Sequence, residues 1–291
     1  MTANQEPDRQ ALEGTPVGRT LTLPTLPLPI LVEPSRTGRL IGLLGLVAAA
    51  LYEYLFLEFP LGRLDQRASF VSELSARDQP WHKLFESFDK TSGVLIVVLA
   101  YGLWRAVPAG RAVTAGCWSL AGFGLSTLGV GLLPMDCAVS ASRACELNDE
   151  LGRVSWMHQG HTVVSVAASL SSITALLLLG RALRARSGWA VAARGSVVVL
   201  PVVVLMDAVL SVVGLGWGRD QTGTFAGELY SYLGSFERIE ILALTVWIAA
   251  LAANLVYVSR GGVRIERDEN RTDDAVQLPG SAVQAPTGAD R

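Results

Sequence analysis

The sequence predicts an all-α polytopic membrane protein, a six-transmembrane-helix bundle with both termini in the cytoplasm. Half of the 291 residues are apolar and only 17% are charged, whereas soluble domains carry about 25% charged residues. Six apolar stretches approach the roughly 20 residues that a helix needs to cross about 30 Å of hydrocarbon. Arginines gather in alternate connections between these stretches.

The ends of the chain are predicted to be disordered cytoplasmic tails. Residues 1–37 mix acidic residues with prolines and lack the basic start and unbroken apolar core of a signal peptide. Residues 268–291 are polar and rich in Gly, Pro and Asp, a composition that buries too little apolar surface to fold. The predicted domains are a tail at 1–37, a transmembrane domain at 38–259 and a tail at 260–291.

Hydropathy places the six spans along the chain. The second apolar stretch is short, but Trp81, Leu84, Phe85 and Phe88 repeat at helical spacing ahead of it. We therefore expect its helix to begin near Trp81 and to enter the membrane obliquely. The predicted spans are residues 40–59, 93–107, 112–133, 156–179, 189–215 and 239–258.

The third span is rich in small residues, including Gly116, Gly124 and Gly131. Small faces let helix backbones approach closely, so we expect this helix to lie centrally in the bundle. The alternative is that the glycines merely loosen the helix. In the fifth span, Pro201 should produce a kink.

Basic residues give the orientation. The connections after the second and fourth spans contain arginines and no acidic residue, whereas the other three are mixed or acidic. The positive-inside rule therefore places both ends of the bundle in the cytoplasm of a bacterial cell, with the protein in the plasma membrane. The arginines concerned are Arg36, Arg39, Arg105, Arg111, Arg181, Arg184, Arg186, Arg194, Arg260 and Arg264.

The loop between the third and fourth spans contains two cysteines on the predicted outer side. Cys137 and Cys145 are eight residues apart, a loop length that a disulfide closes easily, and the outer compartment is oxidising. The bridge would remove about 2–3 kcal/mol of loop entropy. Two free thiols are the alternative. Cys117, within the third span, is interpreted as a small packing residue.

Ionisable groups within spans, or at their outer ends, are the candidates for function, because charge inside a membrane is costly. Arg238 is the expected counter-ion of Glu237, Asp207 or Glu240. We expect these side chains to converge on one outward-facing polar cavity. The candidates are Glu53, Asp136, His158, His161, Asp207, Glu237, Arg238 and Glu240.

The two histidines are three residues apart and so lie on one helix face. They are weak candidates for metal ligation, completed by a carboxylate such as Asp136. General acid–base chemistry without a metal, a polar network that fixes helix packing, and a pocket for the polar end of a ligand remain open alternatives. The site prediction itself contains no metal, and the sequence names no cofactor.

Several short motifs resemble one known family. They are Ser72-Glu73-Leu74-Ser75-Ala76 before the second span, Gly131-Leu132-Leu133-Pro134-Met135-Asp136 ending the third, a histidine opening the fourth, and Glu237-Arg238 opening the sixth. Together they resemble the DUF998 membrane proteins of bacteria and archaea over residues 40–258. The resemblance implies a six-helix bundle and names no reaction.

The same resemblance adds Ser72 and Glu73 to the candidate cavity. The other positions it carries over are Leu74, Pro134, Asp136, His158 or His161, Glu237 and Arg238.

Three classes of function remain open. The first is binding of a lipid or small amphiphile at the outer polar cavity, and the second is intramembrane hydrolysis of a lipid or envelope precursor, possibly with a metal. The third is transport of a small solute, favoured only by Asp207 beside the expected kink. Membrane lipids are the expected partners. A net charge of −2 offers no basic surplus for nucleic acid.

Overall fold

The computed structural model describes residues 35–186, 188–213 and 224–261, and within these ranges it contains helices and no strand. The larger parts of the predicted tails, residues 1–34 and 262–291, lie outside the described residues. So does the predicted end of the fifth span at residue 215.

Long helices alternate with short ones along the chain. The long helices are α1 (Arg36–Tyr52), α3 (His82–Ala106), α4 (Arg111–Leu132), α6 (Trp156–Leu183), α7 (Ala190–Val212) and α9 (Leu233–Ser259). The short elements are α2 (Leu55–Leu61), the 3₁₀ turns η1 (Val71–Ser75) and η2 (Val139–Ala141), α5 (Arg143–Glu150) and α8 (Phe225–Tyr230).

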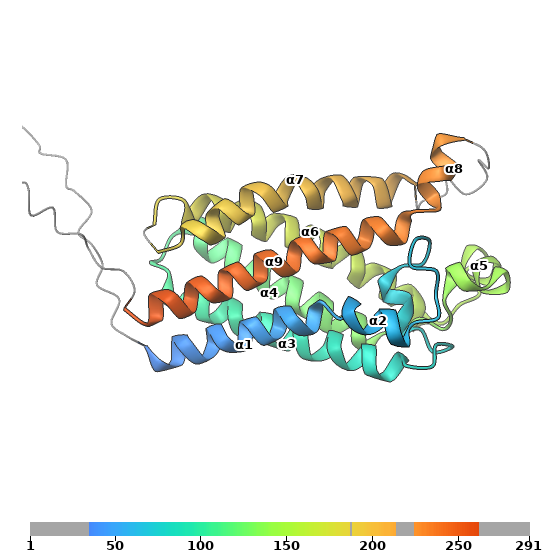
Figure 1. The fold of residues 1–291 in the computed structure, drawn as a ribbon, viewed down its shortest axis with the longest axis horizontal. Coiled ribbons are helices and arrows are strands. Elements are labelled where there is room, and N and C mark those ends of the chain that lie inside the picture. Colours follow the sequence, from blue (N-terminus) through green and yellow to red (C-terminus); the bar gives the residue numbers. More distant parts are fainter. Residues whose placement is uncertain (1–34, 187, 214–223, 262–291) are drawn as a thin grey trace, which may run out of the picture. The chain divides into compact units, whose positions relative to one another are not determined.

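The long helices form a closed ring in chain order. Each packs mainly against its two neighbours, and α9 closes the ring by packing against both α7 and α1 (Figure 1). The third predicted span, α4, therefore lies between α3 and α6, and its expected central position is wrong. Its glycines do allow close packing, because a Cβ at Gly124 would lie 2.7 Å from the Gly93 carbonyl oxygen of α3.

Five helical stretches of the described residues are long and apolar enough to cross a membrane. They are Arg36–Leu61, Arg111–Leu132, Trp156–Leu183, Ala190–Val212 and Leu233–Ser259. The remaining long helix, α3, begins at His82 as its aromatic spacing predicts. Its first three turns carry Lys83, Glu86, Asp89 and Lys90, which lower its hydropathy. The protein is thus a membrane protein with several apolar helices.

The first predicted span is not one continuous helix. Helix α1 ends at Tyr52, and Glu53 leaves the helical conformation with φ −91° and ψ 61°. A separate helix, α2, then begins at Leu55. A uniform apolar run cannot reveal this break, since hydropathy averages over side chains and ignores backbone geometry. Helix α7, in contrast, continues through Pro201.

Apolar side chains fill the inside of the ring and also cover its outside. The inside holds one cluster with the fully buried Trp247, whose indole N–H donates to Ser196 Oγ at 2.8 Å. On the outside each long helix exposes large apolar groups, as a lipid-facing surface requires. Examples, one from each, are Val47, Tyr101, Trp118, Val166, Val198 and Val246.

The two ends of the ring differ in structure. At one end the chain enters and leaves the bundle together, because the Ser35 N–H donates to the Ser259 carbonyl at 3.0 Å. Arg186 joins two connections at this end by donating to the Pro108 carbonyl at 2.7 Å. The other end carries α2, α5 and α8 (Figure 1). We call the first the plain end and the second the capped end.

Candidate functional site

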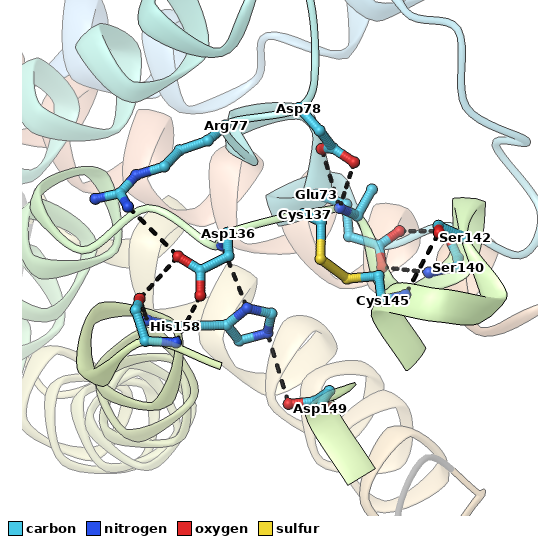
Figure 2. Close-up of a disulfide and its surroundings, with 12 residues drawn as sticks. Glu73, Arg77, Asp78, Asp136, Cys137, Ser140, Ser142, Cys145, Asp149 and His158 are labelled. Atoms are coloured by element: carbon cyan, nitrogen blue, oxygen red, sulfur yellow. Dashed lines mark hydrogen bonds and ion pairs between the residues drawn. A yellow bond between two sulfur atoms is a disulfide. The ribbon is translucent and has the colours of Figure 1, made fainter. Parts of the chain in front are cut away.

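A disulfide fastens the loop after α4 at the capped end. It joins Cys137 to Cys145 in α5, as predicted from their spacing (Figure 2). Ser142 caps the start of α5 by accepting the Cys145 N–H. Cys117 is free and buried in the ring, as expected for a packing residue.

Acidic side chains from the connection before α3 hold this loop through its backbone. Glu73 in η1 is fully buried and accepts the N–H of Ser140 at 2.9 Å and the Ser140 hydroxyl. Asp78 accepts the N–H of Ala138 at 3.0 Å. These bonds satisfy loop amides that would otherwise be buried without partners.

Burial raises the pKa of Glu73, although the hydrogen bonds from Ser140 partly offset this effect. Within the described residues, this carboxyl group has hydrogen-bond donors and no cationic partner. The carboxyl group of Glu73 is therefore held in place by hydrogen bonds, which fits a role in fixing the cap.

Asp136 links the loop to the start of α6. Its carboxylate accepts the N–H of Ser155 at 2.6 Å and the Ser155 hydroxyl at 2.8 Å, and Arg77 lies 3.4 Å away. Partial burial acts to raise the pKa of Asp136, but the two Ser155 hydrogen bonds and the nearby Arg77 guanidinium outweigh it and hold the pKa below its usual value. Figure 2 shows Asp136 between Arg77 and His158.

The two histidines are buried and make different contacts. His158 Nδ1 accepts the Asp136 N–H at 3.2 Å, so the neutral ring carries its hydrogen on Nε2, which faces Asp149 Oδ1 at 3.6 Å. His161 Nδ1 lies 2.9 Å from the Leu133 carbonyl, which can only accept, so Nδ1 carries the hydrogen there. In the described part of the chain, the buried Nε2 of His161 has no partner.

These contacts hold the histidines in opposite tautomers and direct them to different groups. Within the described ranges no set of three or more His, Cys, Asp or Glu side chains is placed to hold a metal ion. A structural zinc site requires four such ligands and a catalytic one about three.

A second polar cluster lies where α2, η1 and α9 meet. Arg238 donates from Nε and Nη2 to the two carboxylate oxygens of Glu58, and from Nη1 to the Ser69 carbonyl at 2.8 Å. Glu58 is 2% exposed. Glu58 is therefore the directly paired counter-ion of Arg238, and Asp207 and Glu240 are not. The Arg238 charge does act on Glu237, one of the expected partners. Glu58 stands one residue inside the end of the predicted first span, and an acid in that position is itself a signal of a buried partner.

Glu237 of the same cluster accepts the N–H of Val71, which opens η1. Ser72 follows, and its carbonyl accepts the Ser75 hydroxyl at 2.7 Å. The backbone of Gly234 lies against the Ser69 carbonyl so closely that a Cβ would overlap it. The geometry of this cluster thus depends on a residue without a side chain.

Glu53, Asp207 and Glu240 lie deeper in the bundle. Glu53 ends α1, Asp207 lies on α7 beside Ser169 of α6, and Glu240 on α9 interacts electrostatically with Asp207. One carboxylate oxygen each of Glu53 and Asp207 is buried with no partner in the described residues. A third such oxygen belongs to Asp89 of α3.

The structure thus divides the predicted site into three groups at or near the capped end. Asp136 and His158 share one group, with Glu73 in the same cap; Glu237 and Arg238 form the second, and the deeper acids form the third. Sequence analysis missed the residues that only tertiary contacts reveal. They are Glu58, Arg77, Asp78, Ser140 and Ser155.

The comparisons with known proteins agree with the short motifs. Residues 40–254 match the DUF998 family, a family described as a protein of unknown function. No curated protein and no solved structure matches the chain. Because the match covers most of the sequence and all the long helices of the ring, this chain belongs to the DUF998 family.

Proposed function

We propose that this chain crosses the bacterial plasma membrane six times, with α3 as the additional span. Support comes from its place between α1 and α4 in the ring. Residues 91–104 of α3 contain no charged side chain, and Val94 and Tyr101 are exposed on its outer face. The buried Glu86 in its charged half lies between Lys83 and Lys90 at 3.1 and 2.9 Å.

The plain end is assigned to the cytoplasm in this proposal. Six crossings return the chain to its starting side, consistent with the bond between Ser35 and Ser259. Arginines gather at that end, in agreement with the positive-inside rule. The Cys137–Cys145 disulfide belongs to the opposite end, which would then face an oxidising compartment.

The proposed activity is binding of the polar end of a lipid or small amphiphile near the capped end. The observation that carries it is the pair of half-buried carboxylates, Glu53 and Asp207, each with a buried oxygen that lacks a donor. An amine or hydroxyl head group would supply that donor. Phe56, Phe59 and Trp156 are exposed at this end, where aromatic rings meet lipid head groups.

Full-length protein extracted from its own membrane with little detergent tests this proposal. Mass spectrometry should find one lipid or amphiphile class enriched over the bulk membrane, and the Glu53→Gln and Asp207→Asn variants should lose that enrichment. Asp65→Asn is the matched control, because Asp65 is exposed near the same end. Equal enrichment in all variants, or none in the wild type, would contradict the proposal.

An intramembrane hydrolase is the second candidate, favoured by the unpartnered Nε2 of His161. A neutral imidazole nitrogen can act as a general base toward a lipid or envelope precursor. Hydrolysis that is lost in His161→Ala and unaffected by chelators would support it. A transporter is the third candidate, favoured by the interruption at Glu53, because transporters place ion sites at broken helices.

A further inference from the structure

Acidic side chains from three helices and a tyrosine from a fourth meet inside the ring near the capped end. Glu240 of α9 lies within electrostatic range of Asp207 of α7. Tyr52 of α1 lies within electrostatic range of Glu240 and of Asp89, the latter from α3. The Tyr52 ring also contacts Phe123 of α4 with a centroid distance of 5.6 Å. The meeting point is therefore inside the ring and not on its lipid-facing surface.

These carboxyl groups are buried without the partners that a charge requires. Glu240 is 7% exposed and has no hydrogen bond or ion pair within the described residues. Asp89 is 3% exposed, and its Oδ2 has no partner there either. A buried carboxylate without a cation or sufficient donors is disfavoured relative to its neutral acid.

The cations near this interior are already paired. Arg238 binds Glu58, and Lys90 binds Glu86 at 2.9 Å. Within the described residues, the charged and titratable groups around Glu240, Glu237 and Tyr52 are otherwise acids or tyrosine. They are Tyr52 and Glu53 of α1, Glu58 next to Arg238, Glu73 of η1, Asp89 of α3, Asp207 of α7 and Glu237 of α9.

The arrangement of these acids favours a proton over a metal ion as the ligand. A metal ion needs several oxygen ligands around one point, and no such group of three exists in the described ranges. A proton needs a single carboxyl oxygen. The interruption of α1 at Glu53 is an independent observation, since non-helical backbone at membrane depth is characteristic of ion and proton sites.

We propose that Glu237, Glu240 and Asp207 form a proton-binding chain that opens at the capped end. Water at that end gives a proton to the partly exposed Glu237. Transfer of the proton to Glu240 and on to Asp207 leaves Glu237 ionised and ready to take the next one. Each ionised carboxyl group gains one proton, and release returns it to water by the same route.

The chain ends within the membrane. Between Asp207 and the plain end, α7 contains no further carboxyl group or histidine, and neither does α9 beyond Glu240. The arrangement therefore stores protons from one side and does not conduct them across. It would couple the charge of the interior to the pH outside, independently of any amphiphile.

Infrared spectroscopy of the full-length protein in lipid nanodiscs tests the proposal, with the carbonyl stretch of protonated carboxyl groups as the probe. The wild type should show a band that weakens reversibly as the pH is raised from about 5 to about 9. The Glu240→Gln and Asp207→Asn variants should each lose about one carboxyl equivalent of that pH-dependent change. Glu228→Gln, an exposed acid on α8, is the matched control and should leave it unchanged.

A wild-type band that is absent, or present and unaffected by pH, would overturn the proposal. So would an unchanged titration in both Glu240→Gln and Asp207→Asn. If one variant fails to fold, the comparison of the other variant with the wild type still decides the question, because Glu73 and Asp89 can also contribute to the wild-type band. Because the readout is the carboxyl band and not a bound amphiphile, a negative result leaves the lipid-binding proposal untouched, and failure of lipid binding leaves this one standing.

Discussion

The plain end and the capped end hold the same ring of helices together by different means. At the plain end the contacts are apolar, between backbone groups or made by a neutral side chain, since Asn254 Oδ1 accepts the Ala192 N–H at 2.9 Å. The described arginines there lie at the surface or bond carbonyls, as Arg186 does with Pro108. At the capped end a buried ion pair, a disulfide and carboxylates that bind loop amides replace them. Apolar packing alone suffices to close a helix ring, so the added polar contacts serve the irregular backbone of the cap.

The difference predicts where single substitutions are most damaging. At the capped end each polar group has a defined partner, so losing one leaves another buried and unsatisfied. At the plain end a lost contact is replaced by water or lipid head groups. The predictions below run from the largest expected effect to the smallest.

Removal of Arg238 should be the most destabilising change. The Arg238→Ala variant leaves Glu58 buried without a cation, and such a break costs about 3–5 kcal/mol. The measurement is unfolding of the purified protein in mixed detergent. Arg67→Ala is the control, because its pair with Asp65 is exposed and should contribute less than about 1 kcal/mol.

A double substitution sharpens the result for this pair. Glu58→Leu combined with Arg238→Leu removes both charges, so it should recover much of the loss. If the double variant were as unstable as Arg238→Ala, the desolvated charge would not be the cause.

Loss of the disulfide should destabilise the cap and leave the ring intact. In the Cys137→Ser, Cys145→Ser variant the loop regains about 2–3 kcal/mol of chain entropy. Hydrogen exchange should therefore rise in α5 and in the loop around Ser140, but not in α4 or α7. Uniformly faster exchange in all the helices would show that the bridge supports the whole bundle.

Two glycines provide a matched test of packing. Gly234→Ala places a methyl group against the Ser69 carbonyl and the Arg238 guanidinium, and overpacking of this kind costs about 1–3 kcal/mol. Gly195→Ala on α7 meets only Trp247 Cδ1 at 3.7 Å, an ordinary contact. There the better helix propensity of Ala should stabilise by up to about 1 kcal/mol. Equal effects at both positions would contradict the close approach at Gly234.

Opposite pH dependences are expected for two acids of the cap. Because the pKa of Asp136 is lowered in the folded protein, its ionised carboxylate stabilises the fold above about pH 3.8. This stabilisation is lost as the pH falls through the pKa of the folded state. The pKa of Glu73 is raised instead, so its contribution to the free energy of unfolding is full below about pH 4.5. That contribution is lost as the pH rises through the pKa of the folded state. The stability of the wild type relative to Asp136→Asn should grow with pH, and relative to Glu73→Gln it should shrink. The same slope in both comparisons would contradict these assignments.

Sequence patterns predicted the parts of this fold that local chemistry determines. Helix α6 begins at Trp156 as expected, because Ser155 is a good N-cap and accepts the His158 N–H. The helical spacing of the aromatic residues located the start of α3. The disulfide followed from cysteine spacing and the expected compartment.

The missed features depend on contacts between distant segments. The partner of Arg238 lies 180 residues away in the chain, and no periodicity connects it to Glu58. The break at Glu53 depends on backbone dihedral angles, which an apolar run does not encode. The closed ring, and hence the position of α4, depends on how α9 meets α1.

The assignment of the two ends to the two sides of the membrane is most directly tested by cysteine labelling in intact cells. The native disulfide is kept, and Cys117 is buried, so only an introduced cysteine should react. With a membrane-impermeant maleimide, the Arg153→Cys variant at the capped end should be labelled in intact cells. The Arg184→Cys variant at the plain end should be labelled only after the membrane is opened. The reverse pattern would contradict the assignment of sides, and with it the uptake of protons from outside the cell.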